Sequence, residues 1–233
     1  MMKRLIVSCA YRAAAIFLLV LILMDGIGHQ PAFAEESLPI HVENQGDLSI
    51  EVFPIKHQLI VRMKGQIIRK YKIAVGNPST PTPIGDYKVV YKGKDWGPSF
   101  GPRWIGLNVP WGTYGIHGTN KPNSIGQHLS HGCIRMRNRD VKELYDLVPI
   151  GSKVTIYGHV LGEPGHDPRN LAEGDVGGDV QLIQSRLRSA GYFHGNCDGK
   201  FRADTTAALK KFQRDHQLIP NGVVGKKVYE ELG

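Results

Sequence analysis

The chain has 233 residues, which is enough for one ordinary domain and a small second one. A hydrophobic fraction of 41% excludes a disordered chain, while 28 glycines and 14 prolines exclude a helical bundle and favour a turn-rich, mainly β architecture. The net charge of +8 suggests an acidic surface as a partner, although a charge that only keeps the protein soluble would look the same.

The first 34 residues have the pattern of an export signal. Lys3, Arg4 and Arg12 accompany an apolar run at 13–24, and Ala-Phe-Ala at 32–34 forms a cleavage site. The run is shorter than the ~20 residues that span a bilayer. We therefore expect cleavage after this segment, with an uncleaved membrane anchor as the alternative.

Cleavage would remove three basic residues and one acidic residue, which lowers the net charge from +8 to +6. The mature protein is then expected to be secreted, in the cell wall or periplasm. The abundant polyanions outside the membrane are wall polymers and lipid head groups, so no nucleic-acid partner is expected.

Six short, mostly alternating runs follow within a first domain at 35–160, and they predict a β-sandwich, with a barrel-like fold as the alternative. Lys64-Gly65 is a suitable hairpin turn between the second and third runs, and the prolines before the fourth run stand at a strand start, where proline is tolerated. The runs lie at 50–53, 57–63, 66–75, within 79–90, at 103–109 and at 152–157.

One helix is expected inside this β region. Asn138 is a candidate N-cap for it, and Pro149 with Gly151 closes the segment. The apolar residues at i, i+3, i+4 and i+7 share one helical face, namely Val141, Leu144, Tyr145 and Val148.

A Pro/Gly-rich stretch at 161–170 is expected to be a linker to a small domain at 171–233. The periodicity there becomes helical, with Asp204 as the expected cap of a second helix and a short third helix at 226–232. The segments 198–205 and 221–228 echo one another. The pattern therefore predicts a compact three-helix module.

The loop at 117–136 contains His117, His128, His131 and Cys133 among glycines. Imidazole and thiolate groups suit zinc, but the H-x-x-H-x-C spacing is not a common zinc pattern, so no metal is expected. A cluster of polar loop residues around a buried cysteine is the simplest alternative. Cys9 falls in the signal, and Cys133 and Cys197 fall in separate predicted domains, which disfavours a disulfide.

A third interpretation makes Cys133 a nucleophile activated by a histidine. The spacing leaves open whether His117 or His131 is the base. Gly118 and Gly132 allow backbone amides to approach a developing oxyanion, and no Asp or Glu lies within the stretch. A backbone carbonyl is therefore expected to orient the histidine.

The two-part pattern "IHGT" (116–119) and "SHGCIRM" (130–136) resembles the catalytic signature of the L,D-transpeptidases of the YkuD family, and "TPIG" (82–85) and "GPRWIGL" (101–107) resemble its upstream landmarks. The resemblance covers roughly residues 47 to 158. It implies that Cys133 is the nucleophile and His117 the base, oriented by the Gly118 carbonyl.

The same resemblance implies an oxyanion hole from the backbone amides around Gly132 and Cys133, and substrate contacts from Ser130, His131 and Arg135. His128 falls outside the signature and is expected at the rim. The implied reaction is acyl transfer from a peptidoglycan stem tetrapeptide through a thioester to an acceptor amine, without a cofactor.

Residues 171–233 resemble a three-helix peptidoglycan-binding module through "VQLIQSRLRSAGYF", "DGKF", "TTAALKKFQ" and "GVVG". Cys197 stands where that module usually has an aliphatic residue, so we expect it to be buried and unreactive. The expected partners are stem peptides and glycan, with a membrane only if the N-terminal segment is uncleaved. An L,D-carboxypeptidase and a non-catalytic wall-binding protein are the alternatives, and the oligomeric state stays open.

Overall fold

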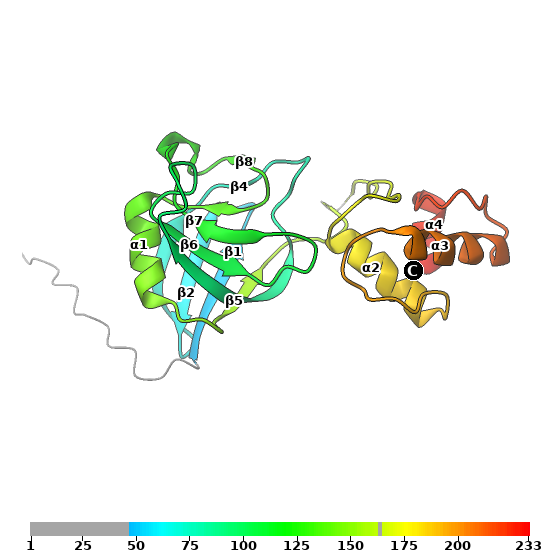
Figure 1. Cartoon of the computed structure of the whole chain (residues 1–233), viewed down its shortest axis with the longest axis horizontal. Helices are drawn as coiled ribbons and strands as arrows, with labels where there is room; N and C mark the ends of the chain where they lie inside the picture. The colour runs from blue at the N-terminus through cyan, green and yellow to red at the C-terminus, as the bar shows by residue number, and fades with distance from the viewer. Residues whose placement is uncertain (1–46, 163–164) are drawn as a thin grey trace, which may run out of the picture. The chain divides into compact units, whose positions relative to one another are not determined.

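The computed structural model describes residues 47–162 and 165–233, and the predicted export signal at 1–34 lies outside them. The first of these ranges is built mainly from strands, which confirms the expected mostly β character (Figure 1). Its strands are β1 (Leu48–Phe53), β2 (Gln58–Met63), β3 (Gln66–Lys72), β4 (Val75–Gly76), β5 (Gly85–Lys94), β6 (Arg103–Leu107), β7 (Tyr114–His117), β8 (His128–Ser130), β9 (Ile134–Arg135) and β10 (Lys153–Ile156).

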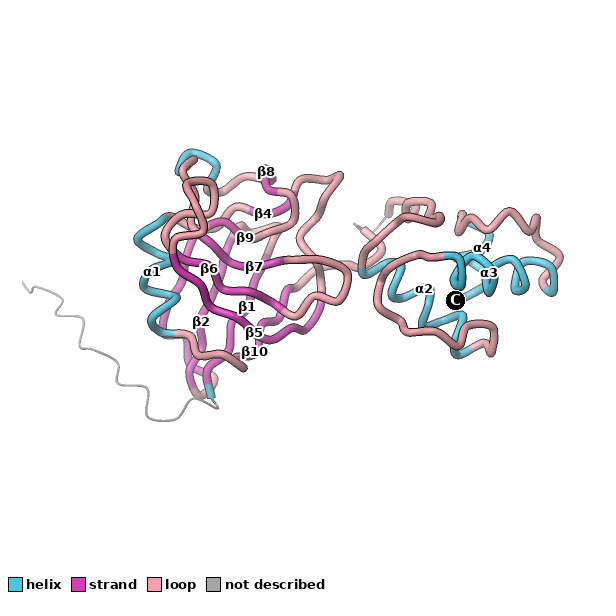
Figure 2. The backbone as a smooth tube through the Cα atoms, in the orientation of Figure 1, coloured by secondary structure: helices cyan, strands magenta, loops and turns pink. Residues whose placement is uncertain are grey.

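These strands form a curled eight-stranded sheet in the order β3-β2-β1-β10-β5-β6-β7-β9, with a two-stranded sheet of β4 and β8. Most neighbours in the larger sheet are antiparallel, but β1 with β10, and β7 with β9, run parallel. The strands β4 and β8 of the smaller sheet are also parallel. Figure 2 shows β6, β7 and β9 side by side, as their pairing requires. The two-layered sandwich expected from the sequence stays a prediction.

The alternation of side chains along the strands places the core on one face of the curled sheet. β1 alternates buried and half-buried positions along its whole length, as a strand with one buried face does. Ile105, Ile116 and Ile134 on β6, β7 and β9 are buried in the same apolar cluster as Val141 and Leu144 of helix α1 (Asn138–Leu147). Helix α1 therefore covers the core face at β6 and β7.

Helix α1 confirms the predicted embedded helix but corrects its cap. Its N-cap is Arg137, and no side chain caps the first turn. Asn138 is instead the first helical residue, and its Oδ1 accepts a hydrogen bond from the Thr119 N–H at 2.9 Å. The expected capping role was wrong because a long-range partner competes for the same amide oxygen.

The range 165–233 carries three helices: α2 (Gly178–Ser189), α3 (Ala203–Asp215) and α4 (Lys226–Leu232). Two buried glutamines explain the echo between the two loop sequences. Gln184 of α2 bonds to the backbone of Gly199 and Lys200, and Gln213 of α3 bonds in the same way to Gly222 and Val223. Each helix thus fixes the loop that follows it.

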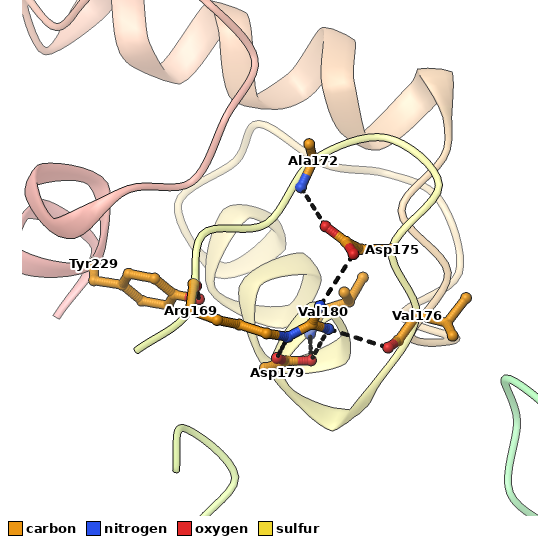
Figure 3. A network of polar contacts seen from close by, with 7 residues as sticks. All are labelled: Arg169, Ala172, Asp175, Val176, Asp179, Val180 and Tyr229. Carbon is orange, nitrogen blue, oxygen red and sulfur yellow. Dashed lines mark hydrogen bonds and ion pairs between the residues drawn. The ribbon is translucent and has the colours of Figure 1, made fainter. Parts of the chain in front are cut away.

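The segment before α2 is packed into this unit. Leu171 is fully buried and pairs with Val224, and Arg169 binds the carboxylates of Asp175 and Asp179 at 3.0 and 2.7 Å (Figure 3). The end of the predicted linker therefore contributes to the fold of the unit. The expected Asp204 cap was wrong, because α3 begins after Arg202 without a side-chain cap.

Within residues 47–162 and 165–233, the helices are all too short or too polar to serve as a membrane span.

Candidate active site

Cys133, His117 and Arg135 share the sheet face that points away from the core. The parallel register of β7 and β9 pairs Ile116 with Ile134 and His117 with Arg135. Because both isoleucines point into the core, their neighbours point to the opposite face. Cys133 directly precedes β9 and so lies level with Gly115, about 8 Å from His117 between Cα atoms by ordinary strand spacings.

The His117 ring is buried, with 3% of the residue exposed, and is held on two sides. Its Nδ1 lies 2.5 Å from the Gly118 carbonyl oxygen, a contact in which the ring nitrogen must donate. The indole of Trp104 stacks on the imidazole at 5.3 Å between ring centroids. This arrangement leaves the lone pair on Nε2, as a base requires.

Burial also sets the protonation state of His117. Loss of hydration is the largest effect on its pKa and lowers it, the backbone carbonyls of Gly118 and Phe100 act in the opposite direction, and the positive charge of Arg135 also lowers it. The net result is a pKa of about 4. The imidazole is therefore neutral near neutral pH.

Cys133 lies in a tight turn organised by Ser130. The fully buried Ser130 hydroxyl donates to the Cys133 carbonyl at 2.6 Å and accepts from the Gly132 N–H at 3.1 Å. Gly132 has a φ of +104°, and a β-carbon there would lie 2.7 Å from Cε1 of Tyr114. The turn thus requires glycine at this position for two independent reasons.

Burial raises the pKa of the Cys133 thiol above its ordinary value, opposed by a hydrogen bond from the Gly115 backbone and by the charge of Arg135. The resting pair is therefore a neutral thiol facing the same side of the sheet as a neutral imidazole. Such a pair suits a reaction in which the imidazole removes the thiol proton as the sulfur attacks.

The remaining predicted residues differ in their surroundings. Arg135 is half-buried, and its charge acts on both His117 and Cys133. His131 is exposed. His128 is exposed on β8, donates from Nδ1 to the Gly76 carbonyl at 3.2 Å, and contacts the ring of His57 edge to face.

Sequence reasoning missed three residues that position the site. Asn138 holds the Thr119 amide and so fixes the turn that carries the Gly118 carbonyl. Trp104 stacks on His117, and Gly115 leaves room for the indole, because a β-carbon there would lie 2.7 Å from Trp104 Cζ2. The strand register, which pairs Trp104 with His117, could have indicated Trp104 and Gly115, whereas the contact of Asn138 with Thr119 depends on the tertiary structure.

The described residues bring no three His, Cys, Asp or Glu side chains together in a way that could hold a metal ion. Cys133 and Cys197 are both free thiols, and Cys197 is half-buried against the core of the 165–233 unit.

Comparison with known families matches two parts of the chain. Residues 48–156 match the L,D-transpeptidase catalytic domain, YkuD, and residues 176–232 match a family described as "Putative peptidoglycan binding domain". Both matches confirm the resemblances drawn from the motifs.

Individual proteins are similar to parts of the chain. "Putative L,D-transpeptidase YkuD" of Bacillus subtilis is 44% identical over 98 residues, which are 42% of this chain and 58% of that protein. The chain thus spans little more than half the length of this relative and, at 55%, of its Bacillus licheniformis counterpart.

"Putative L,D-transpeptidase YqjB" of Bacillus subtilis is 34% identical over 129 residues, which are 48% of this chain and 72% of that protein. A solved structure of the catalytic domain from an E. faecium L,D-transpeptidase is 26% identical, with a TM-score of 0.42 over 49% of this chain and 99% of that one. On the sequence matches, the chain belongs to the L,D-transpeptidase family of the YkuD type and carries a peptidoglycan-binding domain.

Proposed function

We propose that the chain is an exported L,D-transpeptidase that forms peptidoglycan cross-links through a thioester on Cys133. The observation that carries this proposal is the placement of Cys133 and the neutral, buried His117 on one sheet face in a domain of this family. Export is proposed from the basic and apolar pattern at 1–34.

In the first step, Nε2 of His117 takes the thiol proton as the Cys133 sulfur attacks the carbonyl carbon of the diamino acid in a donor stem tetrapeptide. The C–N bond to the terminal D-alanine breaks, and its nitrogen takes the proton from the imidazolium. Donation from Nδ1 to the Gly118 carbonyl supports this role, because it fixes the tautomer and stabilises the transient positive charge.

In the second step, a side-chain amine of an acceptor stem attacks the thioester carbonyl, His117 takes a proton from that amine, and the thiol is regenerated. Water at about 55 M competes with the amine, so the acceptor must be held in place by binding. A site that holds the acceptor poorly would act as an L,D-carboxypeptidase.

The oxyanion of each tetrahedral intermediate needs donors that are not already used. The Gly132 N–H is occupied by the Ser130 hydroxyl, whereas the Cys133 N–H has no acceptor among the described residues. We therefore assign the oxyanion to the Cys133 amide, with Gly132 and Ser130 shaping the turn. Arg135 is assigned to a substrate carboxylate, and the exposed His131 to the substrate rim.

The peptidoglycan-binding domain at 176–232 supports peptidoglycan as the partner. We propose that it keeps the enzyme on the wall and so raises the local concentration of acceptor stems.

Defined tetrapeptide muropeptides test the proposal, with products followed by mass. Transpeptidation gives a dimer that lacks one D-alanine, while a tripeptide alone would favour the carboxypeptidase. Cys133→Ala should abolish both products. Cys197→Ala is the matched control, since Cys197 is the other half-buried free thiol in the part of the chain that the structure describes, and it should keep full activity. Equal activity of the wild type and Cys133→Ala would contradict the proposal.

A further inference from the structure

Three exposed aromatic rings lie together beside the candidate active site. Tyr91 is 49% exposed, Trp96 40% and Phe100 38%, although aromatic residues of this size are usually mostly buried. Trp96 lies 5.8 Å from Tyr91 and 6.4 Å from Phe100 between ring centroids. We call these three residues the aromatic platform.

The aromatic platform packs against the sheet, and its rings are held in place by residues of the strands. Trp96 stacks on the buried Trp104 with centroids 4.7 Å apart and an angle of 6° between the planes. Gly93 makes this possible, because a β-carbon there would lie 2.5 Å from Trp96 Nε1 and 3.0 Å from Tyr91 Cε1. One face of the Trp96 indole is thus covered by Trp104, and the exposed remainder is held in a fixed orientation.

The loop that carries Trp96 and Phe100 is held in one conformation by hydrogen bonds between its own backbone groups. The amides of Phe100 and Gly101 both donate to the Gly97 carbonyl at 3.1 Å, and the Asp95 amide donates to the Pro102 carbonyl at 3.3 Å. A rigid aromatic surface binds a ligand without first losing conformational entropy.

The platform is continuous with the catalytic histidine. The ring of Phe100 contacts His117 at 5.1 Å and Trp104 at 5.6 Å, and Trp104 in turn stacks on His117. A ligand that reaches His117 with one end can therefore lie on the platform with another part.

We propose that the aromatic platform binds a hexosamine ring of the glycan strand, next to the stem peptide that occupies the catalytic site. A pyranose ring has an apolar face of C–H bonds, which suits the negative face of an aromatic ring, and a polar edge of hydroxyl and amide groups. The exposed Lys94 and Asp95, directly before Trp96, can bind that edge. The inference rests on the proposed function, because it takes the sugar to be attached to the donor stem.

The test compares two donors on the full chain: a free tetrapeptide and the same tetrapeptide joined to its disaccharide. We expect kcat/KM to be about fivefold higher for the disaccharide donor, the size of one good aromatic contact. Trp96→Leu should remove most of this preference and Trp96→Phe should retain most of it, since only phenylalanine keeps an aromatic face. Tyr157→Leu is the control, because Tyr157 is 44% exposed and stacked on Phe53 away from the active site.

A Trp96→Leu variant that keeps the full preference would overturn the proposal. An equal fall in kcat/KM for both donors in Trp96→Leu would also overturn it, because the platform would then bind the peptide or position His117 and would not bind the sugar. A second measurement does not depend on catalysis. Tryptophan fluorescence is used to measure the binding of a peptide-free glycan oligomer to the Cys133→Ala variant. Tyr91→Leu retains all the tryptophans and should weaken this binding about fivefold, and unchanged binding would contradict the proposal even if no donor were turned over.

Discussion

Burial of His117 should make the free energy of unfolding sensitive to acid. The pKa of His117 falls from its ordinary 6.5 to about 4 in the folded chain. Below pH 6.5 the unfolded chain takes up a proton at this ring and the folded chain does not, so stability is lost as the pH falls and the loss levels off below pH 4. The difference in pKa corresponds to about 3 kcal/mol at full extent.

Urea unfolding at pH 7 and pH 4, followed by tryptophan fluorescence, measures this loss. The three tryptophans, Trp96, Trp104 and Trp111, all lie within the catalytic domain match at 48–156, so the signal reports this domain. His117→Gln cannot take up the proton. The wild type should therefore lose about 3 kcal/mol more than this variant between the two pH values.

An equal acid-induced loss in both proteins would refute the reasoning. So would an NMR titration of the His117 ring with its midpoint near 6.5, because a buried ring without a carboxylate partner cannot titrate like a free one.

Three further predictions follow from the same site. In the Cys197→Ala background, the rate of Cys133 alkylation by iodoacetamide should show its inflection above the ordinary thiol pKa of 9.0, and an inflection below it would contradict a buried neutral thiol. Ser130→Ala should lower the free energy of unfolding by about 2 kcal/mol, measured in urea, since the buried Gly132 amide and the half-buried Cys133 carbonyl lose their partner. Gly115→Ala should reduce kcat at least about tenfold, because the new β-carbon would lie 2.7 Å from both Trp104 Cζ2 and the Ile105 carbonyl oxygen and would displace the strand and the indole beside His117. Unchanged kcat would show that this packing does not position the histidine.

Local signals in the sequence predicted much of the fold. Lys64 and Gly65 both adopt positive φ, as the expected hairpin turn requires, and helix α4 occupies the predicted 226–232. The strands that carry the site were not predicted, because β7 and β9 are only four and two residues long. Elements this short show no usable periodicity, and they form because the neighbouring strands pair with them.

The motif placed Cys133 and His117 together, but their surroundings depend on contacts between distant segments. Asparagine is a residue type typical of helix caps, yet the side chain of Asn138 accepts a hydrogen bond from the amide of Thr119, nineteen residues earlier. Trp104 resembles an ordinary core residue of a strand, and only the register with β7 shows that it stacks on His117. Such roles depend on contacts between residues that are far apart in the sequence, so no local sequence pattern predicts them.

Trapping the thioester is the direct test of Cys133 as the nucleophile. The mature protein is mixed with a tetrapeptide donor whose diamino-acid side-chain amine is acetylated, so that the donor cannot act as an acceptor. The mixture is then quenched in acid and analysed by intact mass and peptide mapping. The proposed mechanism predicts an adduct of the donor tripeptide acyl group on Cys133. The adduct should be present in Cys197→Ala, absent from Cys133→Ala, and lost on addition of an acceptor amine as the cross-linked dimer forms. Formation of the dimer by Cys133→Ala, or an adduct on any other residue, would contradict it.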